Sequence, residues 1–317
     1  MIMNITGNEI YTGQPEYHDA FWDVVRGKNY CIDKLAKGRN SQTDSYLMPV
    51  TAANKYTKAI EKESLFRQIG TAVNAFNSSY RILAKDCNDL AQFVPEGGQI
   101  PIYDAVNDFT RYTVDTHKLA VFVKLDDDFV HDATFDIEKY LISRLAKNFG
   151  RAETKAFISG TGEQMPAGIL HDTKGADVAL TASTLTYDDV ISLYFSVKPE
   201  YRTNGVWLMN DTTAMTLRKL KDADGSYLWN ANSDTILGKQ VIISEFMPDI
   251  SAGSKPIAFG DFSYYWVVCK KPVTVRTLKE KFVTLDQIGY LAFEFLDGRL
   301  IRPDAVKVIQ METEASA

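Results

Sequence analysis

The stretch QFVPEGGQIPIYDA, residues 92–105, sets a turn, Pro95-Glu96-Gly97-Gly98, between two runs of extended-looking sequence. The upstream run is YRILAKDCNDLAQF, and the downstream run is IYDAVNDFTRYTVDTHKLAVFVKL. A glycine-rich turn between two such runs predicts a long β-hairpin over about residues 80–125. Much of this hairpin is too polar for the core of a protein.

The predicted hairpin is as long as the body that should cover it. Sixteen residues separate Arg81 from Gly97, which is roughly 50 Å of strand, and a compact chain of 317 residues is also about 50 Å across. A two-stranded ribbon alone is only marginally stable in water. We therefore expect its apolar side chains to be covered by a neighbouring copy; the alternative is two shorter strands buried in an ordinary sheet. These side chains are Leu90, Phe93, Val94, Ile100, Ile102, Tyr103, Val106 and Phe109.

Helical periodicity is clearest over residues 135–158, where Ile137, Leu141, Leu145, Phe149, Ala152 and Ala156 recur at spacings of three and four. Thr134 is the expected N-cap, the rod is roughly 36 Å long, and Gly150 costs about 1 kcal/mol. Two shorter helices are expected, in PEYHDAFWDVVRGK (residues 15–28) and over residues 58–69.

Strand signals divide the rest of the chain. Leu119, Val121, Val123 and Leu125 alternate on one face of a strand at 117–125. Residues 175–270 mix helix and strand signals, which is typical of a compact α/β unit. Residues 270–317 are strand-rich and should complete the sheet that carries the long helix.

Charge and cysteine content exclude several classes. The net charge is −6 with a pI of about 5.4, and no basic stripe is visible, the densest clusters being Lys270-Lys271 and Arg218-Lys219-Lys221. Three distant cysteines argue against a disulfide framework and a zinc site. No signal peptide or membrane span is present, so we expect a soluble protein made in the cytoplasm.

Motifs for chemistry are absent, so we predict no enzyme activity, no cofactor and no metal. The run Asp126-Asp127-Asp128 suits helix starts better than a cation site, because its carboxylates point in different directions. GTGEQMPAG at 160–168 lacks the lysine of a phosphate loop, and DADGSYLW at 222–229 has Ala231 where a calcium loop needs glutamate. The histidines show no paired spacing.

The order of these segments resembles a known family. AETKAFISGTG followed by PAGIL, then PIAFGDFSYYWVV, then RPDAV, in this order and spacing, is similar to the major capsid protein of tailed bacteriophages. The resemblance covers essentially the whole chain and implies an α+β Hong Kong 97-type fold. That fold has an N-arm, an extended hairpin called the E-loop, a peripheral P-domain with a long spine helix, and an axial A-domain.

The resemblance also implies boundaries for these parts. In chain order they are the N-arm at 1–55, the P-domain at 56–79, the E-loop at 80–116, the P-domain with its spine helix at 117–174, the A-domain at 175–269, and the P-domain strands at 270–317.

The implied function is self-assembly into hexamers and pentamers that form an icosahedral head around double-stranded DNA, held without sequence-specific binding. Other implied partners are portal, scaffolding and possibly decoration proteins, with no membrane; the location is the virion, after assembly in the host bacterial cytoplasm. The implied subunit contacts are Leu90, Phe93, Val94, Pro95, Glu96, Gly97, Gly98, Ile100, Ile102 and Tyr103 of the E-loop, and Tyr17, Phe21 and Trp22 of the N-arm.

Two departures and two alternatives accompany this resemblance. Some relatives weld subunits through a lysine near the hairpin tip and an asparagine, but here Lys85 lies near the base and TLDQIGY offers only Asp286 and Gln287, so we expect no cross-link. The chain begins fifteen residues before Glu16, so scaffolding is expected to be separate, absent or already removed. The alternatives are an encapsulin-like compartment around cargo enzymes, and an enzyme built on residues 175–270.

Overall fold

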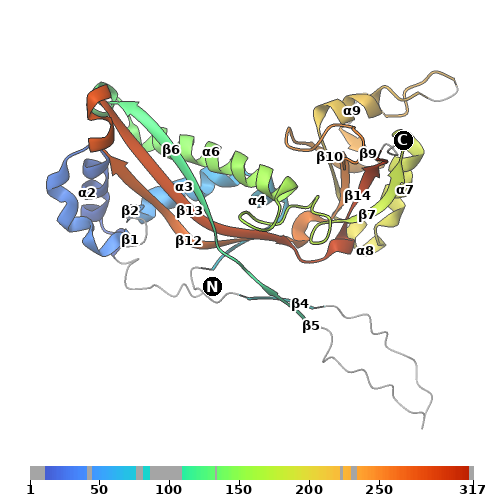
Figure 1. Ribbon diagram of the computed structural model, residues 1–317, viewed down its shortest axis with the longest axis horizontal. Helices are drawn as coiled ribbons and strands as arrows, with labels where there is room; N and C mark the ends of the chain where they lie inside the picture. Colours follow the sequence, from blue (N-terminus) through green and yellow to red (C-terminus); the bar gives the residue numbers. More distant parts are fainter. Residues whose placement is uncertain are drawn as a thin grey trace, which may run out of the picture.

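The computed structural model describes residues 11–40, 45–75, 81–85, 109–132, 134–221, 224–229 and 234–313. Within these ranges two six-stranded sheets lie at the two ends of an elongated molecule, and a third, two-stranded sheet extends to one side (Figure 1). The α+β architecture expected from the sequence is confirmed.

The first sheet has the strand order β1-β2-β12-β13-β6, with β3 paired to β12. Its centre is the antiparallel pair β12 and β13, in register from Tyr265↔Leu300 to Leu278↔Gly289. On β6 the predicted alternation is confirmed, because Val123 is buried and Leu119, Val121 and Leu125 pack against the core. The strands are β1 (Arg39–Asn40), β2 (Ser45–Leu47), β3 (Thr71–Asn74), β6 (His117–Asp126), β12 (Tyr265–Leu278) and β13 (Gln287–Leu300).

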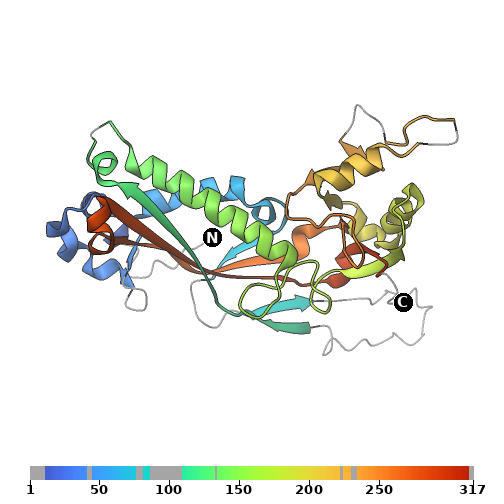
Figure 2. The same cartoon turned by 45° about the horizontal axis from the view of Figure 1, so that its top comes forward.

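Helices α3 (Val50–Glu63), α4 (Leu65–Ile69) and α6 (Ile137–Ser159) pack against this sheet, and α6 runs along most of its length (Figure 2). The helix expected at 58–69 instead begins at Val50 and is broken at Ser64, whose backbone is extended.

Helix α6 confirms the long helix but corrects its cap. Asp136, not Thr134, is the N-cap, since its carboxylate accepts a hydrogen bond from the backbone N–H of Lys139 at 3.0 Å. The side chain of Thr134 instead donates to Asp132.

The buried side of α6 also changes along its length. Ile137, Leu141, Leu145 and Phe149 are buried as predicted. In the last two turns Phe157 and Ile158 are buried in place of Ala152 and Ala156, because this end of the helix packs against a second cluster around Phe66 and Tyr265. The centroid of the Phe157 ring lies 5.6 Å from that of Phe66 and 5.3 Å from that of Tyr265.

The second sheet has the order β7-β14-β11-β8-β10-β9 and encloses a core between its strands and α7, α8 and α9. The strand β14 belongs here, paired in parallel with β7 and antiparallel with β11, so residues 270–317 do not all complete the first sheet as expected. The elements are β7 (Asp177–Ala182), α7 (Tyr187–Ser196), α8 (Pro199–Arg202), β8 (Val206–Met209), α9 (Asp211–Arg218), β9 (Thr235–Ile236), β10 (Lys239–Ile243), β11 (Ile257–Gly260) and β14 (Val306–Met311).

The remaining elements are short helical segments. They are α2 (Pro15–Val25), α5 (Asp127–His131) and the 3₁₀ segments η1 (Asn29–Gly38), η3 (Phe262–Tyr264), η4 (Glu280–Leu285) and η5 (Pro303–Ala305).

Helix α2 contains the three residues predicted for the N-arm contact. Tyr17, Phe21 and Trp22 are only 2–6% exposed and belong to the core cluster of this chain's first sheet. The Tyr17 hydroxyl donates to the carbonyl of Leu47 at 2.7 Å. Most of their surface is covered within the subunit, and their contact with a neighbour stays a prediction.

Gly150 permits the close approach of α3 to α6. A Cβ built at this position would lie 2.8 Å from both the carbonyl carbon and the Cβ of Glu63, and 3.0 Å from the backbone nitrogen of Ser64. Two of these atoms are backbone and cannot rotate away. The glycine is therefore a packing requirement in addition to a helix-propensity cost.

We predict that Gly150→Ala destabilises the fold. Helix propensity alone would raise the free energy of unfolding by about 1 kcal/mol, whereas forcing apart two packed helices costs about 1–3 kcal/mol. Urea unfolding of the unassembled chain should give a net loss of about 1 kcal/mol. Asn148→Ala, on the same helix, is the control and should leave stability equal or slightly higher; a gain for Gly150→Ala would contradict the packing argument.

Candidate functional site at the base of the projecting strands

The projecting sheet consists of β4 (Arg81–Lys85) and β5 (Phe109–Thr113), which pair antiparallel from Arg81↔Thr113 to Lys85↔Phe109. Within the described ranges these strands pair with each other and with neither six-stranded sheet. In Figures 1 and 2 they lie on the opposite side of the first sheet from α6. This arrangement favours the hairpin over two strands buried in an ordinary sheet. The ten predicted E-loop contacts, between Leu90 and Tyr103, lie outside the described residues.

A buried carboxylate on β13 anchors the chain where β5 ends. Asp297 accepts hydrogen bonds from the backbone N–H groups of Asp115 and Gly298, both at 2.8 Å. The Nε2 atom of His117, at the start of β6, lies 3.5 Å from the same carboxylate. Burial raises the pKa of Asp297, while the two backbone donors partly oppose the shift. The link between β5 and β6 is therefore fixed to the sheet by two contacts to one side chain, from Asp115 and His117.

The aromatic side chain of Tyr112 also holds β5 against the body of the chain. The Tyr112 hydroxyl donates to the carbonyl of Ile301 at 3.1 Å, and the Arg299 guanidinium lies 4.5 Å from the centroid of the Tyr112 ring. Tyr112 and Trp266 also pack against a small buried cluster that includes Val268. The hairpin thus leaves the body at a defined point, held by polar and apolar contacts.

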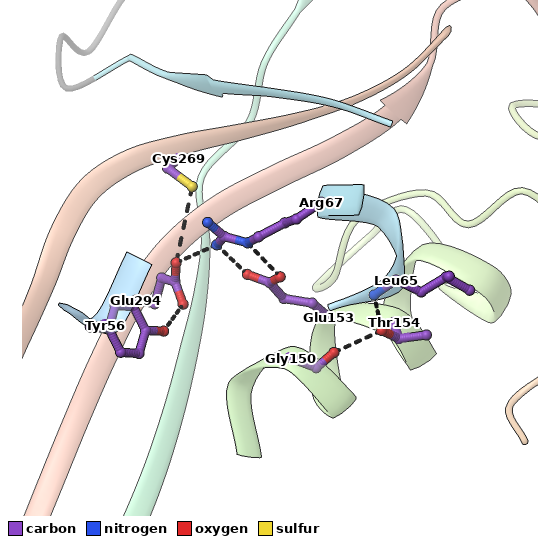
Figure 3. A network of polar contacts seen from close by, with 8 residues as sticks. All are labelled: Tyr56, Leu65, Arg67, Gly150, Glu153, Thr154, Cys269 and Glu294. Carbon is purple, nitrogen blue, oxygen red and sulfur yellow. Dashed lines mark hydrogen bonds and ion pairs between the residues drawn. The ribbon is translucent and has the colours of Figure 1, made fainter. Parts of the chain in front are cut away.

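A second buried carboxylate on β13, Glu294, faces the helices (Figure 3). The Arg67 guanidinium lies between two acids: it donates to Glu153 at 2.5 and 2.9 Å and to Glu294 at 2.7 Å. The Tyr56 hydroxyl donates to the other oxygen of Glu294 at 2.9 Å. These residues come from α4, α6, β13 and α3, so one cluster joins the helices to the sheet.

The cluster carries one positive group for two carboxylates, and its charges are almost free of water. The side chains of Arg67, Glu153 and Glu294 are 6%, 0% and 4% exposed. Burial, followed by the nearby Glu153 carboxylate, raises the pKa of Glu294 to about 7 despite the opposing effect of Arg67. Burial likewise raises the pKa of the neighbouring Cys269 thiol to about 12. A cluster closed to solvent in this way suits a structural role and not the binding of a substrate.

Strand β13 therefore carries the acids that hold both the helices and the base of the hairpin. Successive side chains alternate across a strand, so Glu294 and Asp297, three residues apart, point to opposite faces. Glu294 fixes the helices on one face, and Asp297 fixes the base of the hairpin on the other.

Sequence reasoning missed this cluster, although a signal was present. Glu153 lies on the buried side of the predicted long helix, four residues after Phe149, and Glu294 lies within the apolar run YLAFEFL. An acid at a core-facing position requires a buried partner, but the sequence does not identify that partner.

Three further observations concern the other candidate motifs of the sequence. Among the described residues, no three or more His, Cys, Asp or Glu side chains are grouped as ligands for a metal ion. Asp127 and Asp128 occupy the first turn of α5, as their role at a helix start requires. Within the same ranges, none of the helices has the length and apolarity to cross a bilayer.

We predict that Glu294 makes stability fall as the pH rises through neutrality. Its pKa in the folded protein, about 7, is above the ordinary glutamate value of 4.5. The folded state therefore binds more protons than the unfolded state between these two pH values, and raising the pH removes that stabilisation. The fall is of the order of 1.4 kcal/mol per pKa unit at most.

Glu294→Gln should flatten this dependence. The free energy of unfolding should be measured in urea at pH 5, 6, 7 and 8. Across this range the value for the variant should rise by about 1–3 kcal/mol relative to that of the wild type. Asp188→Asn, at an exposed helix start, is the control and should leave the slope unchanged. Parallel curves for the wild type and Glu294→Gln would show that this carboxyl does not titrate there.

Comparison with known proteins supports the expected family. The model of the Phage capsid family matches residues 44–311. Among curated proteins no match is found.

Solved capsids share the fold. The capsid of an empty GTA particle is 31% identical, with a TM-score of 0.68 over 79% of this chain and 90% of that one. The capsid of a native GTA particle is 29% identical, with a TM-score of 0.65 over 92% and 99%. A structure from Microbacterium phage Oxtober96, at 16% identity and a TM-score of 0.59 over 79% and 91%, shows the same fold. The chain therefore belongs to the phage capsid family, and it is a non-enzymatic, self-associating major capsid shell protein of phage or GTA particles.

Proposed function

We propose that this chain forms hexamers and pentamers that close into an icosahedral head around double-stranded DNA, in a virion assembled in the cytoplasm of a bacterial host. The observation that carries this proposal is the pair β4 and β5, which is anchored to the body through Asp297 and Tyr112 but belongs to neither large sheet. A projecting ribbon of this kind needs cover from a second copy. Portal, scaffolding and possibly decoration proteins are the further partners of such a shell.

The open face of the first sheet is suited to receive the hairpin of a neighbouring copy. Phe122 on β6 is 40% exposed, and Leu285, at the end of the adjoining η4, is 60% exposed. Lysine ammonium groups stand over phenylalanine rings on the same strands and on η4, with Lys118 4.1 Å from the centroid of Phe293 and Lys124 5.7 Å from that of Phe282. This face therefore combines exposed apolar surface with positive charge.

The hairpin has the complementary composition. Residues 86–108 contain five acids and no lysine or arginine, alongside the apolar residues predicted to contact a neighbour. Opposite charge gives register and specificity to a contact whose stability comes from apolar burial. Closed symmetry then repeats the contact around each ring of subunits. The acids are Asp86, Asp89, Glu96, Asp104 and Asp108.

We predict that shortening the hairpin leaves a folded chain that cannot close a shell. Replacing residues 90–104 by Asn-Gly removes the contact residues but keeps β4 and β5 paired. Circular dichroism should be unchanged, whereas electron microscopy and light scattering should show no closed particles. Closed particles of normal size from this variant would overturn the proposed role of the hairpin.

Charge reversal tests the receiving face separately. Lys118→Glu with Lys124→Glu should also prevent closure, because both charges would repel the acidic hairpin. Lys58→Glu with Lys62→Glu, on the exposed side of α3, is the matched control and should still yield shells. DNA as the content of purified particles supports a virus-like head; a co-purifying enzyme would support the encapsulin-like alternative.

We also predict that mature particles are held without covalent links between subunits. The only lysine of residues 80–116 is Lys85, which pairs with Phe109 at the outer end of β4 and is twelve positions from Gly97 in the turn; the chain offers Asp286 and Gln287 where relatives with a weld have asparagine. A denaturing gel of mature particles should show one band at about 36 kDa, the mass of 35.6 kDa. A ladder of multimers that survives denaturant and reductant would contradict this.

A further inference from the structure

Helix α6 carries a row of cations on its outer side. Arg144, Lys147, Arg151 and Lys155 follow one another at spacings of three, four and four, so they share one side of the helix. All four are exposed, and that side is opposite the one that packs on the sheet. From the first to the last residue the row extends for about 16 Å.

Little negative charge is available to neutralise this row. Arg144 donates to the hydroxyl of Tyr140 at 2.6 Å. Arg151 pairs with Glu245 at 2.9 Å, but both side chains are more than half exposed, so water screens this pair. Lys147 and Lys155 have no ion-pair partner within the part of the chain that the structure describes.

A hollow adjoins the first half of the row. It has a volume of about 480 Å³ and opens widely to solvent. Figure 2 shows α6 at the front of the molecule with no other described element crossing it. The row is therefore accessible over its whole length to an extended polyanion. The hollow is lined by Phe135, Asp136, Lys139, Tyr140, Ser143, Arg144 and Lys147.

We propose that this row binds the phosphate backbone of nucleic acid without reading its sequence. Such binding is supplied almost entirely by lysine and arginine that replace counterions along the phosphates. Four cations along one straight helix meet this requirement, although the chain as a whole is acidic. The inference rests on the proposed function, because it makes the side of α6 the inner surface of a shell around DNA.

The apolar surface of the molecule argues against the other polyanions. None of the exposed large apolar side chains among the described residues lies on α3 or α6. The acidic hairpin of a second copy brings apolar side chains that need cover, and an anionic membrane surface is bound by cations together with inserted apolar groups. The row offers mainly charge, with Phe135 and Tyr140 lining the hollow at one end, and charge is sufficient for nucleic acid.

The row corrects the expectation that the sequence holds no basic stripe. Its members are separated by two or three other residues along the chain, among them Leu145, Phe149 and Glu153, which point into the core. Only the helical geometry brings the cations together on one side.

The test measures binding of the purified full-length chain to a random 30-base-pair DNA duplex between 50 and 300 mM salt. For three to four neutralised phosphates, the logarithm of the binding constant should fall against that of the salt concentration with a slope of about −3. The variant R144Q/K147Q/R151Q/K155Q should bind at least tenfold more weakly at 50 mM salt, with a slope near zero. The control K34Q/K174Q/K219Q/K281Q removes four exposed lysines elsewhere and should bind within twofold of the wild type.

Electron microscopy of the same variants reports shell formation separately. Each binding outcome therefore decides this proposal independently of the proposed function. Equal binding by the α6 variant and the wild type would overturn it, and so would a loss confined to the control variant. Binding to vesicles with 30% anionic lipid but not to the duplex would assign the row to a membrane instead. In filled particles, Lys147 and Lys155 should react at least threefold more slowly with an acylating reagent than in empty ones; equal rates would place the row away from the contents.

Discussion

The arrangement of the first sheet and its helices depends on the ion pairs that the guanidinium of Arg67 makes with two buried acids. It lies between Glu153 of α6 and Glu294 of β13, and all three groups are excluded from water. Without Arg67, two carboxylates would face each other inside the protein, and breaking a buried pair in this way costs about 3–5 kcal/mol. The position of the long helix on the sheet is therefore fixed by charge as well as by apolar packing. Because Asp297 on the same strand holds the base of the hairpin, the direction of the hairpin is fixed relative to the helix.

The parts of the fold that could be predicted from the sequence are those with local periodicity. The long helix and the alternation of β6 follow from spacing alone, since each residue's side is set by its neighbours in the chain. The contacts that could not be predicted join residues far apart: Arg67 and Glu294 are separated by 227 positions. The expectation that β14 joins the first sheet was wrong for the same reason, because the residue pattern of a strand does not identify the strand it pairs with.

The α2 residues illustrate a different limit. An amphipathic helix in a segment without a core of its own must pack against something, and the sequence does not distinguish the same subunit from a neighbour. The structure places Tyr17, Phe21 and Trp22 in the core of the first sheet. In the hairpin, β4 and β5 pair outside both large sheets within the described ranges, and its cover by a neighbouring copy stays a prediction.

Net charge also conceals how charge is distributed over the two sides of the first sheet. The chain carries −6 overall, yet the outer side of α6 presents four cations, and the open face of the sheet presents lysines over the rings of Phe293 and Phe282. The two surfaces differ in one respect that determines what each can bind. The sheet face combines charge with exposed Phe122 and Leu285 and so can stabilise a contact by apolar burial, which persists at high salt. The α6 face offers mainly charge, and contacts of that kind weaken as salt rises. In the proposed shell, the sheet face is suited to permanent contacts between subunits, and the α6 face is suited to reversible contacts with the contents.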